Sequence, residues 1–210
     1  MDLYSMSLWQ VFLAGGPVMW PILLCSIFAL AIAVEKFWHL YRIKIDTQEF
    51  LRNILDNMKK HQTKEALQTC DSTNSPIARI LKAGILKYDR TRDQIKEAIE
   101  DASLYEIPRL EKNLTALATI AHVSPLLGLL GTVTGMVRAF QMIQAKSTSF
   151  HPVSPGDLAG GIWEALITTV AGLVVAIPTF VAYNYLVSRI NSFILEMEKA
   201  ATELVNFLTE

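Results

Sequence analysis

The sequence has few of the residues that build metal centres and disulfide frameworks, with two cysteines and four histidines among 210 residues. The histidines are His39, His61, His122 and His151, and they fall in separate segments rather than at the spacing of a ligand set. Cys25 lies in an apolar run and Cys70 in a charge-rich segment, so we expect packing roles and no disulfide between them. We therefore predict no metal ion and no other cofactor.

Catalytic motifs are absent too. The sequence holds no Ser/His/Asp or Cys/His arrangement and no phosphate-binding loop, which argues against an enzyme with catalytic residues. The formal net charge is −1, and the lysines and arginines alternate with acids as on solvated helix faces. This composition gives no reason to expect binding to nucleic acid.

Charge is also missing from most of the second half of the chain. Between Lys112 and Glu196 the charged residues are Arg138, Lys146, Asp157, Glu164 and Arg189, whereas charges are dense between Glu35 and Lys112. A partition of this kind is typical of a membrane protein with one soluble segment.

Three stretches are apolar and long enough to cross about 30 Å of hydrocarbon, which takes roughly 20 residues. They are residues 16–34, the stretch between Lys112 and Arg138, and the stretch between Glu164 and Arg189. No basic residue precedes the first stretch and no convincing cleavage site follows it. We therefore interpret it as a retained anchor and not as a signal peptide.

The distribution of basic residues predicts the orientation. Fifteen of the nineteen lysines and arginines lie in residues 36–112, and the loop between the second and third spans offers only Lys146. Because positive charge is retained on the cytoplasmic side, residues 36–112 and the C-terminal tail are expected in the cytoplasm and the N-terminus outside.

The remaining pattern is helical, with start signals at Thr47, Thr63, Ser75 and Thr91 and no strand-like alternation. Pro108 is expected to kink or divide the helix that leads into the second span. We predict an all-α integral membrane protein whose three transmembrane helices are extended by a cytoplasmic helical bundle. The expected segments are an outer interfacial helix at 1–15 (or an early start of the first span), transmembrane helices at 16–35, 113–144 and 161–188, a cytoplasmic helical segment at 36–112, an outer loop at 145–160 and a cytoplasmic C-terminal helix at 189–210.

Small residues gather on one side of the second span. Gly128, Gly131 and Gly135 share this side with Thr132 and Pro125, and larger aliphatic residues cover the other side. Small residues spaced in this way allow membrane helices to approach closely. Many membrane helices show this pattern, so it predicts packing and not a particular function.

The third span repeats the design and adds a carboxylate. Glu164 shares a face with Thr168, Thr169 and Gly172, while Ile167 falls on the opposite side, suited to lipid or to a neighbouring subunit. A proline at position 178 is expected to free a carbonyl one turn earlier and to bend the helix. The face of Glu164 is predicted to line a lumen or a seam between helices.

Glu164 is the residue most suggestive of function. A carboxylate near a bilayer is expensive and commonly marks an ion or proton path. Burial would favour its protonated form, and the hydroxyls of Thr132, Thr168 and Thr169 can donate and accept hydrogen bonds in a short water chain. One carboxylate among hydroxyls suits a proton better than a metal ion. The alternative is a structural Glu164, bonded to the backbone or to an interface partner, or lying among lipid headgroups.

The second and third spans resemble the MotA/TolQ/ExbB proton-channel family, and most closely its short ExbB-like or TolQ-like members. The resemblance is carried by LATIAHVSPLLGLLGTVTGM at residues 117–136 and GGIWEALITTVAGLVVAIPTFVAYN at residues 160–184. Glu164 matches the family's intramembrane glutamate, and Thr132 and Thr169 match its two threonines. Pro125 and Pro178 match its prolines.

The resemblance implies a homopentamer, with the second and third spans around a lumen that holds an ExbD- or TolR-like partner. The partner's single span would bring a protonatable Asp, and a TonB-like protein is a further possible partner. The implied function is a proton-motive-force-driven motor subunit that energises TonB- or Tol-type transport across the cell envelope. The alternatives are a structural membrane scaffold and a self-sufficient ion channel. Three spans argue against a four-span flagellar stator.

Overall fold

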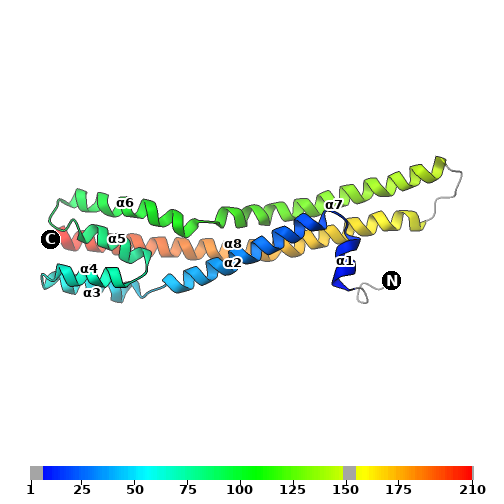
Figure 1. Cartoon of the computed structure of the whole chain (residues 1–210). Helices are drawn as coiled ribbons and strands as arrows, with labels where there is room; N and C mark the ends of the chain where they lie inside the picture. Colours follow the sequence, from blue (N-terminus) through cyan, green and yellow to red (C-terminus); the bar gives the residue numbers. More distant parts are fainter. Residues whose placement is uncertain (1–6, 149–154, 210) are drawn as a thin grey trace. The chain divides into compact units, whose positions relative to one another are not determined.

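The computed structural model describes residues 7–148 and 155–209, and every secondary-structure element within them is a helix (Figure 1). The helices are α1 (Leu8–Ala14), α2 (Met19–Ile43), α3 (Thr47–Lys59), α4 (Thr63–Ser72), α5 (Pro76–Ile85), α6 (Arg92–Glu111), α7 (Leu114–Thr148) and α8 (Pro155–Thr209). The chain forms two compact units. The first unit is Met1–Val34 with Leu114–Asn184, and the second unit is Glu35–Asn113 with Tyr185–Glu210.

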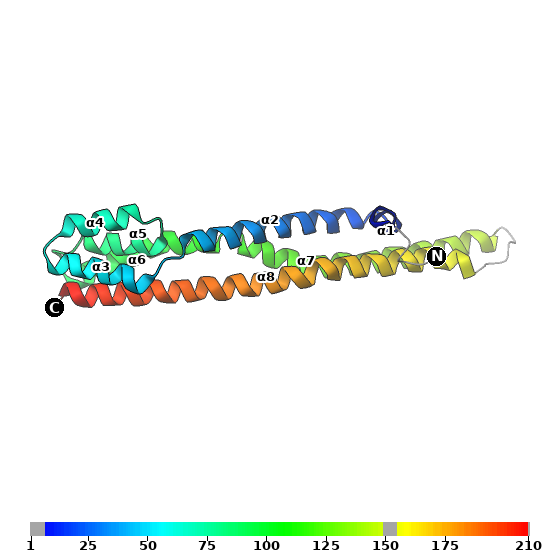
Figure 2. The same ribbon diagram turned by 90° about the horizontal axis from the view of Figure 1, so that it is seen from below.

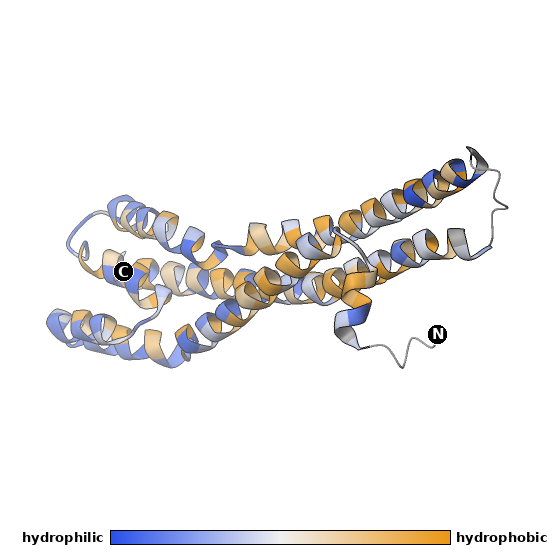
Figure 3. Cartoon of the chain, turned by 45° about the vertical axis from the view of Figure 1, so that its right-hand side comes forward, coloured by the Kyte–Doolittle hydropathy of each residue, from blue (hydrophilic) through white to orange (hydrophobic). Residues whose placement is uncertain are grey.

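Three helical stretches in the described residues are long and apolar enough to cross a membrane, and they include α2 and most of α7 and α8. Hydrophobic colour dominates the parts of these helices that belong to the first unit, whereas hydrophilic colour is frequent on α3, α4 and α6 of the second unit (Figure 3). The prediction of an all-α membrane protein is confirmed.

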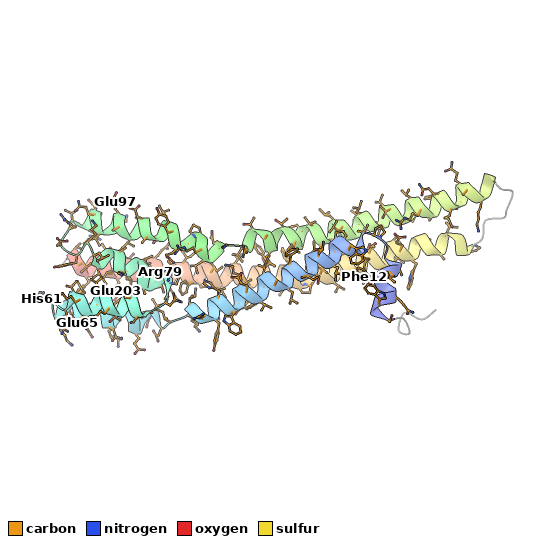
Figure 4. The ribbon with its side chains drawn as sticks, in the orientation of Figure 1. Phe12, His61, Glu65, Arg79, Glu97 and Glu203 are labelled. Atoms are coloured by element: carbon orange, nitrogen blue, oxygen red, sulfur yellow. The ribbon has the colours of Figure 1, made fainter. Side chains whose placement is uncertain are left out.

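In the first unit, α1 is a short helix of its own. The side chain of Ser7 accepts a hydrogen bond from a backbone amide of the first turn and closes a capping box. The helix ends at a turn in which Gly16 has a φ of 70°, a conformation that favours glycine. Phe12, labelled in Figure 4, packs edge-on against Trp20 of α2 with ring centroids 5.1 Å apart. This turn separates residues 8–14 from α2.

The helices α7 and α8 run beside each other in the first unit in both views (Figures 1 and 2). The predicted outer loop at 145–160 is helical at both ends, because α7 continues to Thr148 and α8 begins at Pro155. Proline is well suited to a first helical turn, where its missing N–H has no partner to lose. The remainder of the predicted loop, residues 149–154, lies outside the described residues. The helix α8 also continues through Arg189 without a break, so the predicted tail helix at 189–210 is its extension.

The second unit is a bundle in which α3, α4, α5 and α6 pack on a core of aliphatic side chains. Its fully buried residues include Ile54, Ile77, Leu81, Ile95 and Leu204. Thr91 caps α6 as expected, and Ser75 is the N-cap of α5 with a proline after it. The start of α3 is one residue earlier than expected, since the Asp46 carboxylate accepts from two backbone amides at 3.1 Å. The hydroxyl of Thr47 instead bonds the Glu196 carboxylate at 3.0 Å.

An ion pair between a partly exposed arginine and a buried carboxylate joins α5 to α6. Glu106, whose side chain is 6% exposed, accepts from Arg79 at 2.7 Å and from Arg109 at 3.1 Å. Arg79 projects from α5 in Figure 4. Two guanidinium groups therefore compensate one buried carboxylate, the condition under which a buried charge is tolerated.

The helix that leads into the second span is interrupted at Lys112–Asn113 and not at Pro108, which stays inside α6. Asn113 has a φ of 67°, in the left-handed region that asparagine tolerates and that an α-helix cannot contain. Lys36 donates from its ammonium to the carbonyl of Leu110 at 3.1 Å, near the end of α6, and is 2% exposed. Of the two effects expected of Pro108, a kink or a division of the helix, the division is wrong, because the helix ends at Lys112–Asn113, where φ becomes positive.

Candidate functional site

Glu164 lies on α8 in the first unit and forms an ion pair with Arg138 of α7. Its Oε1 atom contacts the Nη1 atom of Arg138. The Glu164 side chain is 12% exposed and the Arg138 side chain 48% exposed, so the carboxylate is the more enclosed half of the pair. The two residues are 26 positions apart and meet because α7 and α8 are antiparallel neighbours.

The turn between α1 and α2 closes over this carboxylate. A Cβ atom added to Gly16 would lie 2.8 Å from Cδ of Glu164 and 3.2 Å from Nη1 of Arg138. A Cβ added to Gly15 would approach a methyl carbon of Ile167 at 3.1 Å. Ile167 is 7% exposed, so its expected position toward lipid or a neighbouring subunit is wrong for this chain. Glu164 and Ile167 are three positions apart, so they lie about 60° apart around the helix axis and the same N-terminal turn covers both.

The glycines of α7 and α8 lie where the two backbones come closest. A Cβ at Gly128 would stand 3.0 Å from the carbonyl oxygen of Thr168, and one at Gly172 would stand 2.6 Å from the carbonyl oxygen of Ser124. Gly131 faces the Thr168 side chain with no room for a Cβ. A Cβ at residue 135 would lie 2.6 Å from the carbonyl oxygen of residue 161. The small-residue faces of the second and third spans therefore meet as a seam within one chain.

The hydroxyls along this seam bond the helix backbone. Thr168 is fully buried and donates to the carbonyl oxygens of Glu164 at 3.1 Å and Ala165 at 2.9 Å. Thr169 donates to the carbonyl of Ala165 at 3.1 Å, and Thr132 to that of Leu129 at 2.6 Å. A hydroxyl that donates to a carbonyl keeps its lone pairs as acceptors. The oxygens of Thr132 and Thr169, which are partly exposed, can therefore accept from a water or a protonated group, whereas Thr168 is closed off from water.

The two prolines predicted to shape the spans lie inside continuous helices. Pro125 lies within α7 and Pro178 within α8. Beside each proline a hydroxyl donates to a carbonyl one turn earlier, from Ser124 at 2.8 Å and from Thr179 at 2.6 Å. The accepting carbonyls are those of Ile120 and Val175, each next to the i−4 carbonyl that the proline leaves without an N–H donor.

His122 lies on α7 and contacts both its own helix and α8. Its Nδ1 atom lies 2.7 Å from the Ala118 carbonyl, and its ring meets Phe180 edge-on with centroids 6.1 Å apart. Among the described residues no three His, Cys, Asp or Glu side chains gather as a metal-binding group. The chemistry available around Glu164 is that of one carboxylate, one guanidinium and several hydroxyls.

Sequence reasoning did not pair Arg138 with Glu164, nor did it connect Gly16 to either residue. The signal available was charge scarcity, since Arg138 is among the few charged residues between Lys112 and Glu196. An isolated cation and an isolated anion in neighbouring apolar helices are expected to form an ion pair. The register between α7 and α8 is what decides the pairing, and the sequence does not supply it.

The fold and this site define a helical membrane protein with a carboxylate and a guanidinium paired across two candidate membrane-spanning helices. Residues 72–199 match the model of the MotA/TolQ/ExbB proton channel family. The chain belongs to this family, which confirms the resemblance seen in the sequence. The family is a class of proton channels and not of enzymes.

Several curated relatives match most of the chain. A putative biopolymer transport protein ExbB homolog from Methanothermobacter thermautotrophicus is 30% identical over 90% of this chain and 66% of its own length. A putative biopolymer transport protein ExbB-like 1 from Synechocystis sp. is 36% identical over 84% of this chain and 69% of its own length. The Tol-Pal system protein TolQ of Haemophilus influenzae is 47% identical over 41% of this chain and 36% of its own length. The chain thus spans about two thirds of the ExbB-type relatives named here and a shorter part of the TolQ protein.

Proposed function

We propose that the chain is an ExbB-like motor subunit of a bacterial inner membrane, which uses the proton motive force to energise TonB- or Tol-type transport across the cell envelope. Membership of the proton channel family supports this function, as do the relatives named as biopolymer transport proteins. The single observation that carries it is an enclosed carboxylate, Glu164, beside the glycine and threonine seam of α7 and α8.

The proposed assembly is a homopentameric ring around an ExbD- or TolR-like single-span partner, with a TonB-like protein as a possible further partner. Large aliphatic and aromatic side chains exposed on α7 and α8 support contacts with lipid or with other subunits, and they include Leu126, Val133, Phe140, Val170 and Val174. The proposed topology has the N-terminus in the periplasm and the C-terminus in the cytoplasm, supported by the basic residues of 36–112.

The experiment is substitution of the carboxylate in the complex with the partner. Glu164→Gln keeps the shape and removes the charge, and we expect proton flux into liposomes to fall to background while the assembly remains intact. Val170→Leu, an apolar exchange on the exposed side of the same helix, is the control and should keep wild-type flux. Wild-type flux in Glu164→Gln would refute the proposal.

A structural scaffold is the second candidate function. It is favoured by the hydroxyls of Thr132 and Thr169, which donate to backbone carbonyls as structural threonines do. A scaffold tolerates Thr132→Val and Thr169→Val, which keep the shape of the side chain and lose the hydroxyl. The motor subunit should lose proton flux in at least one of these variants while both assemble normally.

A further inference from the structure

The two side chains of the Arg138–Glu164 ion pair differ in exposure. Glu164 is nearly enclosed, whereas about half of the Arg138 side chain is accessible. If the pair separates, Arg138 can turn its guanidinium toward water or headgroups on its long stem, as membrane arginines do. Glu164 has no comparable exit, because Gly16 stands against its carboxylate.

Other groups packed around the carboxylate do not replace Arg138. The turn before α2 contributes Gly15 and Gly16, which carry no ionisable side chain. On α8 itself the nearby Thr168 hydroxyl donates to backbone carbonyls. From α7 the facing group is the guanidinium. Among the described residues, the charge of Glu164 is therefore compensated by Arg138.

We propose that Arg138 is a positioning residue that latches Glu164, so that the carboxylate accepts a proton only when the guanidinium moves away. This inference rests on the proposed function and names the regulation of the same site. In the latched state the carboxylate is ionic and bonded. In the open state one proton from water on the outer side joins a carboxylate oxygen, Glu164 becomes neutral, and Arg138 keeps its own proton and charge.

In this latch, Gly16 leaves the space that the Glu164 carboxylate needs to reach Arg138. A side chain at this position would occupy the space of the Glu164 carboxylate and would push it off Arg138. Because Gly16 also has a positive φ, a substitution there strains the turn as well as the pair. Arg138 is the cleaner position to test, since its side chain can be shortened without altering the backbone.

The first test uses the purified chain in detergent without a partner. The variants are Arg138→Gln, Glu164→Gln and the double variant, with Arg189→Gln as the control because Arg189 bonds Tyr185 elsewhere on α8. We expect each single variant at the pair to lower the melting temperature by about 3 °C or more, and the double variant to lie no lower than the worse single. Losses that add in the double variant would show that the two side chains are not coupled.

The second test measures proton flux against pH in liposomes that hold the complex. Arg138→Gln should change the pH profile of the flux, because the guanidinium no longer holds the Glu164 carboxylate. Arg138→Lys, which keeps the charge, should stay near wild type, as should Arg189→Gln. An unchanged profile in Arg138→Gln overturns the latch.

The two proposals fail in different ways. If Glu164→Gln abolishes flux but Arg138→Gln keeps the wild-type profile, the motor function stands and the latch is wrong. If Glu164→Gln conducts as wild type, the proposed function is wrong whatever the melting data show. Coupled melting with a shifted profile supports both.

Discussion

The Thr168 side chain packs against Gly131, where an added Cβ would have less room than at the other glycines of the α7–α8 seam. The threonine is fully buried, and the space that a Cβ of Gly131 would need is taken by its side chain. Because tightly packed interiors have no room for an added methyl group, this contact depends on the absence of a side chain at Gly131. At the residue scale the seam is therefore most sensitive at its glycines.

Gly131→Ala is expected to destabilise the chain by about 1–3 kcal/mol through overpacking. Gly160→Ala is the matched control on α8, since nothing lies within 4 Å of a Cβ there. Helix propensity should leave this control as stable as wild type or slightly more stable. Thermal unfolding in detergent measures both variants, and equal melting temperatures would contradict the packing described.

The buried thiol of Cys70 is expected to react slowly while the chain is folded. Burial raises the pKa of Cys70 to about 11, with the negative charge of Asp71 adding to the effect. In a Cys25→Ser variant, we expect slow reaction of the folded chain with iodoacetamide at pH 8 and fast reaction after unfolding. Rapid labelling of the folded chain would contradict it.

The same shift predicts a pH dependence of stability. Because the folded-state pKa of Cys70 is raised above the ordinary value of 9.0, the neutral thiol stabilises the fold fully below pH 9. That contribution is lost as the pH rises from about 9 through about 11. Melting temperatures at pH 8 and pH 10.5, compared with those of Cys70→Ala, measure it. The alanine variant should lose less stability over this range than the parent.

At the scale of elements, the junction after α6 is held by a lysine from α2. Lys36 is buried and donates to the Leu110 carbonyl, one of the last four carbonyls of α6, which lack partners within the helix. A cation at a helix C-terminus also interacts favourably with the helix dipole.

Lys36→Met is expected to cost about 1–3 kcal/mol, because it leaves a buried carbonyl without its donor. Lys112→Met removes an exposed lysine at the same junction and should change stability by no more than about 0.5 kcal/mol. Hydrogen exchange at the end of α6 together with thermal unfolding measures both effects. A Lys36→Met variant as stable as Lys112→Met would show that the bond contributes nothing.

Elements were predictable where one residue type decides the local geometry. Thr91 and the Ser75–Pro76 pair mark helix starts as expected, and the 100° periodicity places Glu164 with Thr168 on one face. The break at Asn113 was not predictable, because asparagine adopts a left-handed φ only where the surrounding structure requires it. The partner of Glu164 was not predictable either, since it depends on the register of two helices.

At the scale of the whole molecule, the family match relates both units to one class of proton channel. The match at 72–199 covers parts of both units, because it includes α5 and α6 of the second unit as well as α7 of the first unit. Two thirds of the length of the ExbB-type relatives described above is matched by this chain.

The proposed topology predicts where reporters work. A fluorescent protein fused after Glu210 should fold and fluoresce in the cytoplasm, and alkaline phosphatase inserted in residues 149–154 should be active in the periplasm. A fusion of the same phosphatase after Lys87, in the charge-rich segment, is the inactive control. An active phosphatase at Lys87 would reverse the orientation.

Gly16, which lies against the Glu164 carboxylate, also leads to a prediction about related sequences. Gly16 has no room for a side chain while the Glu164 carboxylate and the Arg138 guanidinium occupy the space beside it. The residue at position 16 should therefore vary together with those at positions 138 and 164. In homologues where a short uncharged residue replaces Arg138, we expect the steric demand on Gly16 to relax and the demand of its backbone angle to remain. Substitutions there should be restricted to asparagine and aspartate, which tolerate positive φ best. Covariation of these three alignment columns would therefore report which family members use the same latch.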